Sequence, residues 1–278
     1  MKKIITQFFL FLCLSANSQT NQNINKTVGT VFNPINQIDS IRFNLLTNQM
    51  EVVLQSGAVA HPLSEITNVT FSTSASIGCG GITSVTDIDG NIYPVVEIGN
   101  QCWTKENLKT AKYADGSVIP NVTGDSAFVS FSTGAWCNYG DSAGNDSVYG
   151  KLYNWHTVAD PRNVCPAGWH VPTDTEWTTL INFLGGDSIA GGKMKTTTGW
   201  QAPNTGATNE SGFSGLPGGY RSSSTGTFGN VGNNGYWWSS SEFDAYRAWT
   251  RYLSYFNGLA YRSTNIIQSG FSVRCLRD

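Results

Sequence analysis

Glycine is the residue that most constrains the fold of this chain, because 30 of its 278 residues are glycines. Glycine weakens the interior of helices and strands, and it permits the backbone angles that tight turns need. Aromatic residues are abundant as well, with 14 Phe, 11 Tyr and 9 Trp, so we expect a core built partly from rings. The combination predicts short strands and many turns, in one large domain with at most a small additional module.

The balance of charge excludes two classes of partner. Charged residues make up only 13 % of the chain, and its formal net charge is −2. A chain of this kind has no bulk electrostatic attraction for nucleic acid or for an anionic membrane surface. We therefore expect neither nucleic acid nor an anionic membrane as a partner.

The first 18 residues have the pattern of a signal peptide. Lys2 and Lys3 precede an apolar run from Ile4 to Leu14, and small and polar residues follow up to Gln19. This order of positive, apolar and small residues is typical of export signals. The apolar run is far shorter than the roughly 20 residues that span a bilayer, so a membrane anchor is not expected. The sequence predicts an extracytoplasmic protein, secreted or associated with the outer surface, with no transmembrane segment after cleavage.

Three segments are predicted before the main domain, residues 82–278. Residues 19–37 are rich in Asn, Gln and Thr and indicate a flexible lead-in. Residues 38–72 contain the pattern Ile-x-x-(Ile/Val)-x-Phe twice, with a third β-prone run between the copies, and predict a small module of three or four strands. Residues 73–81 are predicted to form a linker.

Two hairpins and one helix have clear local signals in the main domain. The turns at 89–91 (Asp-Gly-Asn) and 257–258 (Asn-Gly) each separate two β-prone runs, and such residues accept the positive φ angles of hairpin turns. Thr173 and Glu176 have the spacing of a capping box and predict a helix that ends before Gly185. Shorter helices are predicted at 188–195 and 150–158, and a final strand at 271–276.

Eight short blocks of the main domain carry a family resemblance. They are Val85–Asn91, Ile98–Trp103, Glu106–Leu108, Gly168–Thr173, Gly206–Phe213, Leu216–Arg221, Gly235–Ser240 and Gly270–Cys275. Taken together and in this order, they resemble the Fibrobacter succinogenes major paralogous (FISUMP) domain family. The resemblance implies an extracytoplasmic protein, and it implies no established activity.

A more distant likeness implies a fold. The block that begins at His170 (His-Val-Pro-Thr-Asp-x-Glu-Trp) and the closing block 270–274 are similar to blocks of the formylglycine-generating (sulfatase-modifying) superfamily. That likeness implies an α+β fold: a β-rich, loop-rich, C-type-lectin-like domain with one or two helices, here preceded by the small β module. Enzymes of that superfamily use two close cysteines late in the chain or a multi-histidine iron site. Here Cys275 stands alone after Cys165 and only three histidines exist, so we expect no catalytic residue, metal or cofactor.

Five cysteines follow the predicted signal peptide: Cys79, Cys102, Cys137, Cys165 and Cys275. Outside the cytoplasm they are expected to oxidise, but their spacing does not determine which pairs form. Because Cys165 and Cys275 both lie beside blocks of the family resemblance, we expect them to form one disulfide. The other three then contain a second disulfide and one spare thiol, and that pair stays open.

The aromatic-rich C-terminal part contains the candidate binding residues. Trp237 and Trp238 are adjacent and point to opposite faces of a strand, so one of them is expected to be exposed. Exposed rings beside polar donors can stack on sugars or anchor a protein partner. The alternative is a β core that uses these rings for packing. The candidate set is Tyr236, Trp237, Trp238, Glu242, Arg221, Asn209 and Glu210, and Tyr220, Trp249, Tyr252, Tyr255 and Tyr261 lie near it in the sequence.

Three functions stay open at this point. We favour non-catalytic binding of a glycan or a cell-surface partner through the aromatic-rich part. The alternatives are an enzyme of the formylglycine-generating lineage with an unrecognised site, and a structural or adhesive surface component docked through residues 38–72. His156 and His170 are interpreted as structural, because neither has a predictable acid partner. Glu210 has an alternative role as a buried, loop-organising residue paired with Arg221 or Arg274.

Overall fold

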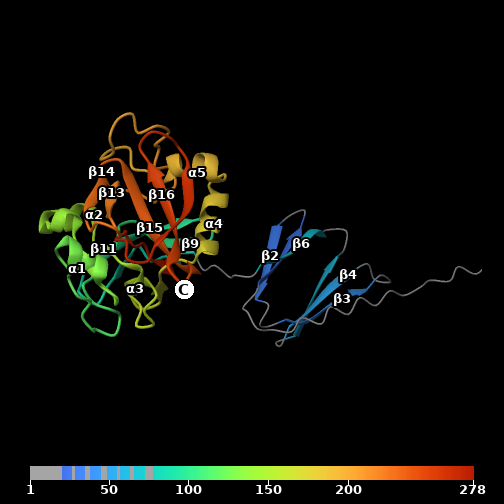
Figure 1. Cartoon of the computed structure of the whole chain (residues 1–278). Coiled ribbons are helices and arrows are strands. Elements are labelled where there is room, and N and C mark those ends of the chain that lie inside the picture. The colour runs from blue at the N-terminus through green and yellow to red at the C-terminus, as the bar shows by residue number, and fades with distance from the viewer. Residues whose placement is uncertain are drawn as a thin grey trace, which may run out of the picture. The chain divides into compact units, whose positions relative to one another are not determined.

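The structure, a computed structural model, divides the chain into two compact units, Met1–Ser76 and Ile77–Asp278 (Figure 1). It describes residues 78–278 in full. Before them it describes only the backbone of six strands that fall within residues 21–72. The predicted signal peptide, residues 1–18, and most of the predicted linker lie outside the described residues.

The described residues of the first unit form two antiparallel sheets of three strands, with the orders β2-β1-β6 and β3-β4-β5. The module predicted at 38–72 therefore contains four strands. The prediction of a flexible lead-in at 19–37 is wrong for residues 21–34, because β1 pairs with both β2 and β6. The strands are β1 (Asn21–Lys26), β2 (Gly29–Pro34), β3 (Ile38–Asn44), β4 (Gln49–Leu54), β5 (Gly57–Pro62) and β6 (Ile66–Ser72).

The second unit begins with the predicted hairpin of β7 (Ser84–Thr86) and β8 (Ile92–Ile98). These strands belong to a five-stranded sheet with the order β12-β18-β9-β8-β7. Its third member in sequence is β9 (Gln101–Thr104), and the other two are β12 (Trp169–His170) and β18 (Leu276–Arg277). Segments from both ends of the unit therefore build one sheet.

The middle of the second unit consists of short elements. Gly150 adopts a φ of 70° and ends α2, so the helix predicted at 150–158 is wrong in its first half. Leu152 lies in β11 instead, and only α3 is helical, with the Asn154 side chain accepting from the Thr157 N–H at its start. The elements are α1 (Asp125–Ser130), β10 (Trp136–Cys137), η3 (Tyr139–Asp141), η4 (Ala143–Asn145), α2 (Asp146–Tyr149), β11 (Leu152–Tyr153) and α3 (Trp155–Val158).

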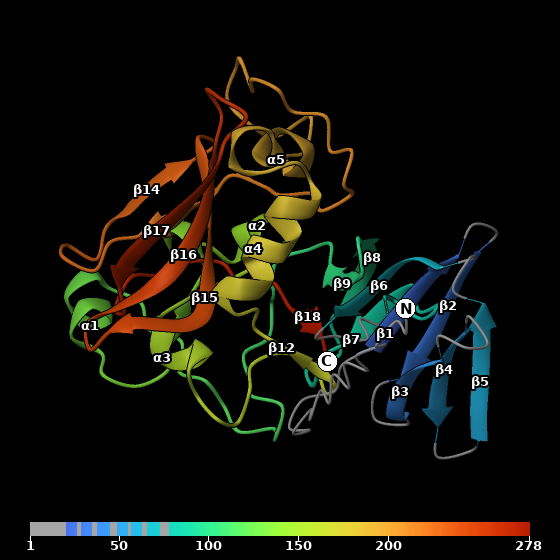
Figure 2. The same ribbon diagram turned by 90° about the vertical axis from the view of Figure 1, so that its right-hand side faces the viewer.

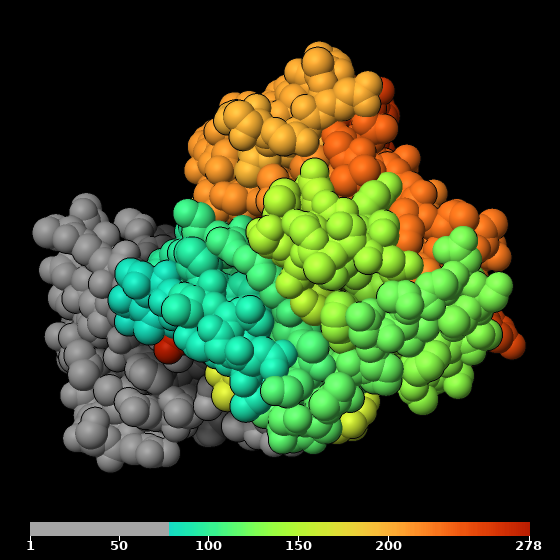
Figure 3. Space-filling view, turned by 90° about the vertical axis from the view of Figure 1, so that its left-hand side faces the viewer, coloured from blue at the N-terminus to red at the C-terminus, as the bar shows by residue number. Residues whose placement is uncertain are grey.

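This middle segment packs against the C-terminal part of the unit. In the space-filling view of one face (Figure 3), its green and yellow-green atoms lie directly against orange atoms of the later chain. Arg221 joins the two parts, because its buried guanidinium donates to the carbonyl oxygens of Val122 (2.9 Å) and Gly226 (2.8 Å). The same guanidinium lies over the rings of Phe128 and Phe228.

Two helices follow, as the sequence predicts. In α4 (Asp174–Phe183) the Thr173 side chain and the Glu176 side chain form the complete capping box. Trp177, Leu180 and Ile181 of α4 are buried. The second helix is α5 (Asp187–Met194). It begins and ends one residue earlier than the helix predicted at 188–195.

The C-terminal sheet has the order β14-β13-β15-β16-β17. Its members are β13 (Gly218–Arg221), β14 (Phe228–Val231), β15 (Asn234–Asp244), β16 (Arg247–Ser254) and β17 (Ala260–Ile266). The β16–β17 hairpin contains the turn predicted at 257–258. Helix α4 lies against one face of β15 and β16, and α5 lies beside β17 (Figure 2). The strand predicted at 271–276 makes only isolated bridges, to Tyr153 and Trp237, until β18 begins.

Two disulfides and several buried cations hold the second unit together. The expected bond between Cys165 and Cys275 is present, and Cys79 pairs with Cys102. The fully buried Arg274 donates to Asn107 Oδ1 (2.7 Å) and to backbone carbonyls, and burial lowers the pKa of Arg274 to about 9. The architecture confirms a β-rich α+β fold, while the C-type-lectin-like topology stays a prediction.

Candidate functional site

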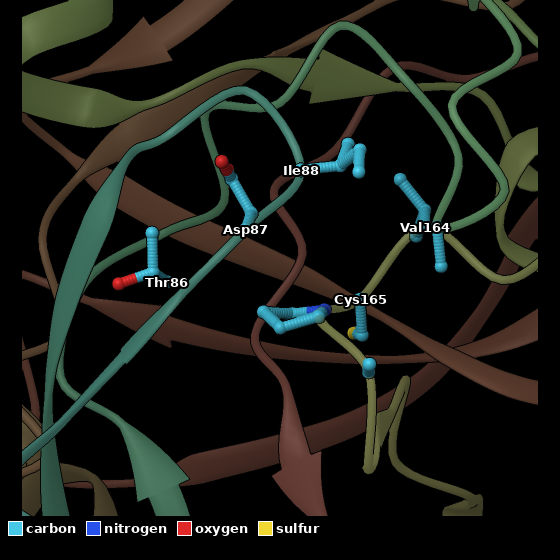
Figure 4. Close-up of a pocket in the computed structure, with 8 residues that line it drawn as sticks. Thr86, Asp87, Ile88, Val164 and Cys165 are labelled. Carbon is cyan, nitrogen blue, oxygen red and sulfur yellow. The ribbon is translucent and has the colours of Figure 1, made fainter.

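A small pocket of about 160 Å³ lies beside the Cys165 disulfide (Figure 4). Asp87 is the acidic residue in its lining. Both oxygens of that carboxylate are already used: Oδ1 accepts from the backbone N–H groups of Asp89 and Asn91, and Oδ2 accepts from the Asn91 amide and the Tyr93 hydroxyl. Asp87 therefore organises the hairpin turn, and its carboxylate is not free to bind a ligand in the pocket.

The described residues 78–278 contain no group of three His, Cys, Asp or Glu side chains placed to hold a metal ion. Burial raises the pKa of the Cys137 thiol to about 12, and this cysteine is fully buried. The predicted spare thiol is therefore Cys137, held in its unreactive protonated form. Burial lowers the pKa of His156, whose Nε2 atom has no hydrogen-bond partner among the described residues.

His170 has two acid partners that the sequence did not indicate. Its Nδ1 atom lies 2.5 Å from Asp278 Oδ1, and its Nε2 atom lies 3.1 Å from both carboxylate oxygens of Glu176. Burial alone would lower the pKa of His170, but the hydrogen bonds to Glu176 and Asp278 outweigh it, so the pKa is raised. Because Glu176 is also the capping-box residue of α4, the imidazole ties the start of that helix to the last residue of the chain.

The two tryptophans at the centre of the predicted binding set are both buried. Trp237 is 1 % exposed and Trp238 is 0 % exposed, so the expectation that one of them is exposed is wrong. Trp237 packs on Phe213 on the side of α4, with its ring N–H donating to Asn107 Oδ1 (2.8 Å). Trp238 packs on Phe271 on the opposite side, with its ring N–H donating to the Tyr153 carbonyl (2.8 Å). Each face of β15 is covered at this point, because helices lie on one side and residues near α3 on the other.

The remaining polar members of the set do not gather at one place. Arg221 is buried in the contact with the middle segment. Asn209 bridges its own loop by accepting from the Ser214 N–H (2.9 Å), and Glu210 is exposed and lies 3.4 Å from Lys193. The alternative pairing of Glu210 with Arg221 or Arg274 is therefore wrong. Glu242 is exposed near the far end of β15, opposite Ala248.

Tyr236, the last member of the set, belongs to a row of tyrosines. It lies opposite Tyr252 on β16, and Tyr252 lies opposite Tyr261 on β17. Directly opposite residues share one face of a sheet, so the three side chains point away from α4 and α5. We call this side the outer face and the side covered by the helices the inner face. All three tyrosines are half-buried.

The rings of the row stack on one another. Tyr236 and Tyr252 have ring centres 5.4 Å apart, and Tyr252 and Tyr261 have centres 4.3 Å apart with an interplanar angle of 1°. Phe271 continues the stack behind Tyr236 at 5.2 Å. We call these four residues the tyrosine stack. Because the ring faces meet each other, the stack presents ring edges and hydroxyl groups to solvent over most of its length.

Amide side chains accompany these hydroxyls. Tyr236 Oη accepts from Asn230 (3.1 Å) and Asn234 (2.8 Å), and Tyr261 Oη accepts from Asn257 (2.6 Å). Tyr252 Oη has no partner among the described residues, yet it is not among their buried unpartnered atoms, so it faces solvent. Burial raises the pKa of Tyr252 above its ordinary value of 10, which keeps this hydroxyl protonated. A ligand therefore meets hydroxyls and amides that both donate and accept hydrogen bonds.

The outer face carries no charge at the positions around the stack, which are Asn234, Tyr236 and Trp238 on β15, Ala248, Thr250, Tyr252 and Ser254 on β16, and Tyr261, Ser263 and Asn265 on β17. Glu242, opposite Ala248, belongs to the same face and places a carboxylate near the far end of β15. A surface of rings, hydroxyls and amides without ionised groups can bind an uncharged polyol, since it offers hydrogen bonds without the cost of desolvating a charge.

The sequence indicated this region but not its composition. Tyr252 and Tyr261 were noted only as neighbours of the candidate set, and Asn230, Asn234 and Asn257 were missed. Their arrangement depends on the observed register of the β16–β17 hairpin, which brings the two tyrosines side by side with Asn257 next to them and which the Asn-Gly turn signal does not give.

Residues 96–277 match the family model described as the Fibrobacter succinogenes major domain. No curated protein and no solved structure matches the chain. No helix among the described residues is both long enough and apolar enough to cross a bilayer.

Proposed function

This chain belongs to the Fibrobacter succinogenes major domain family, and we propose that it is an exported, non-catalytic protein that binds an uncharged glycan on its outer face. The observation that carries the proposal is the tyrosine stack, with its solvent-facing hydroxyls and adjoining amides. Carbohydrate hydroxyls both donate and accept, and so do phenol and amide groups. The outer-face positions around the stack are uncharged and the carboxylate of Glu242 lies farther along the same face, which favours a neutral glycan over an acidic one.

The oxidised cysteines support an address outside the cytoplasm. Two disulfides join Cys79 to Cys102 and Cys165 to Cys275. Disulfides persist in oxidising compartments and are rare in the cytosol. The two disulfides agree with the signal peptide predicted at residues 1–18. We therefore propose that the protein is extracytoplasmic.

The state of the cysteines also favours binding over catalysis. Cys275, which stands alone late in the chain where the formylglycine-generating enzymes use two close cysteines, is bonded to Cys165. Cys137 is buried with a raised pKa. Neither sulfur is available as a thiolate nucleophile or ligand.

A glycan array with the full protein, produced in an oxidising compartment, tests this function. We expect binding to neutral glycans and weaker or no binding to acidic ones. Tyr252→Lys puts a charge into the row and should abolish the signal. The matched control is Tyr246→Lys, because Tyr246 is 74 % exposed and lies outside the stack.

Circular dichroism of both variants shows whether they are folded. An array on which the protein binds no neutral glycan would overturn the proposal, and so would equal binding by the folded Tyr252→Lys variant and the wild type.

A further inference from the structure

We infer that a single pyranose ring of the glycan stacks on the outward ring face of Tyr261, so that the protein recognises one sugar unit and not a flat polysaccharide surface. This inference rests on the proposed function and specifies its ligand. Most ring faces of the tyrosine stack are already covered by a neighbouring ring.

Each interior ring of the stack is covered on both sides. Tyr236 lies between Phe271 and Tyr252, and Tyr252 lies between Tyr236 and Tyr261. Tyr261 is the last ring, and no further aromatic ring of residues 78–278 stacks on it. Its strand, β17, is also the edge strand of the C-terminal sheet. The face of Tyr261 that points away from Tyr252 is therefore the ring face of the three tyrosines that no aromatic ring of residues 78–278 stacks on.

Tyr261 is held in place before any ligand arrives. The ring lies parallel to Tyr252 at 4.3 Å, and its hydroxyl accepts from the Asn257 amide at 2.6 Å. The Asn257 Oδ1 atom in turn accepts from the Leu259 N–H (3.0 Å), which fixes the amide in the hairpin turn. Little side-chain entropy is then lost on binding, and preorganised rings of this kind favour affinity.

The stacked arrangement also decides against a flat polymer. A planar polysaccharide surface needs several ring faces lying side by side in one plane. Here the rings of Tyr236, Tyr252 and Tyr261 face one another, so only edges and hydroxyls point outward over the first two. One sugar can place its apolar C–H face on Tyr261 while its hydroxyls reach neighbouring polar groups. Additional sugar units find no second ring face.

Calorimetry with a series of neutral glycosides tests the inference, from the methyl pyranoside of the best array sugar to its tetrasaccharide. We expect most of the affinity to be present in the single unit and to change little with length. Tyr261→Leu should weaken binding about tenfold, because the ring face is lost. Tyr261→Phe keeps the ring and should lose less.

Saturation-transfer NMR of the methyl glycoside gives an independent readout. The C–H protons on one face of the sugar should receive the strongest saturation, and that pattern should vanish in Tyr261→Leu. Binding that rises steeply with chain length, or that is equal in Tyr261→Leu and wild type, would overturn the inference and leave glycan binding intact. Failure of every neutral glycan to bind would instead overturn the proposed function.

Discussion

The two faces of the β15–β16–β17 sheet have opposite chemistry, although their residues alternate along the same three strands. On the inner face, Arg251 and Arg262 both bind the carboxylate of Asp174, at 2.6 and 2.7 Å. On the outer face, the tyrosine stack and its amides carry no charge. The inner face is covered by α4 over β15 and β16, whereas the outer face keeps solvent-facing hydroxyls next to its edge strand.

This difference shows that aromatic content does not identify a binding face. Trp237 on the inner face and Trp238 on the outer face are larger than any tyrosine of the row, yet both are enclosed. Large rings are buried wherever another element can cover them. The half-buried tyrosines are distinguished by their position beside the edge strand, which only the strand order reveals.

The largest loss of stability is expected from removing the Asp174 carboxylate, which both inner-face arginines share. Asp174→Ala leaves Arg251, whose side chain is 3 % exposed, buried without its charge partner. Loss of one member of a buried pair costs about 3–5 kcal/mol, and we expect a loss in the free energy of unfolding at the lower end of that range. Urea denaturation measures it.

The matched control is Asp244→Ala, because Asp244 pairs with Arg247 on the exposed hairpin end. Its denaturation midpoint should stay at the wild-type value. Equal midpoints for the Asp174 and Asp244 variants would mean that the inner-face ion pairs do not depend on their burial.

A smaller loss is expected from the outer face. Tyr261→Ala removes one stacked pair, and aromatic pairs contribute about 0.5–1.5 kcal/mol beyond the area that they bury. We expect the free energy of unfolding to fall by about 1–2 kcal/mol, because the ring is half-buried. Thermal or urea unfolding gives the value. A loss as large as that of Asp174→Ala would contradict the distinction between the helix-covered inner face and the outer face.

The pH dependence of stability should separate the faces further. The pKa of His170 is raised above its ordinary value of 6.5, so its contribution is fully present below about pH 6.5 and is lost as pH rises through the folded value. His170→Gln should remove this loss above about pH 6.5, an effect below about 1 kcal/mol for a partly exposed pair. Melting temperatures across this range measure it.

The contribution of Glu176 to stability has the opposite pH dependence. Burial raises its pKa, but the hydrogen bonds from His170 and Thr173 outweigh burial, and the net pKa lies below its ordinary value of 4.5. Its contribution is present above pH 4.5 and is lost as the pH falls through the folded value. Glycan binding on the outer face should stay constant over the neutral range, because the Tyr252 hydroxyl remains protonated. A binding profile that follows His170 would contradict the separation.

The smallest effect on stability is expected from the loss of a single outer-face hydroxyl. Tyr252→Phe removes a hydroxyl that faces solvent and leaves the ring in the stack. The free energy of unfolding should change by no more than about 0.5 kcal/mol, as for other surface changes. Glycan affinity should fall measurably in the same variant. A large loss of stability with unchanged affinity would show that this hydroxyl serves the fold.

Local signals predicted the elements that depend on neighbouring residues. The capping box at Thr173 and Glu176 gave α4, and the Asp-Gly-Asn turn gave the β7–β8 hairpin. The short strand β11 could not be found in this way, because its partners are β10 and Phe271, far along the chain. The strand β1 was missed because its Asn-rich sequence has low β propensity, although it pairs with the neighbouring β2 and with the distant β6.

The tyrosine stack depends on the register between β16 and β17, and the Asn257-Gly258 turn alone predicts a different register. A two-residue turn at Asn257-Gly258 would pair Phe256 with Leu259 and would place Tyr252 opposite Ser263. The observed connection is longer, with Leu253 opposite Ala260, and this shift by two residues brings Tyr252 opposite Tyr261. A shift by two keeps every side chain on its face, so the sequence could indicate the aromatic region but not the stack.

The position of β18 has a consequence for when the second unit can mature. Its two residues, Leu276 and Arg277, lie between β12 and β9 inside the five-stranded sheet. That sheet stays split into separate pieces until residue 277 has left the ribosome, and the bond between Cys165 and Cys275 must also wait for the late cysteine. Completion of this sheet and of the late disulfide is therefore a post-translational step, whatever the rest of the unit has already formed.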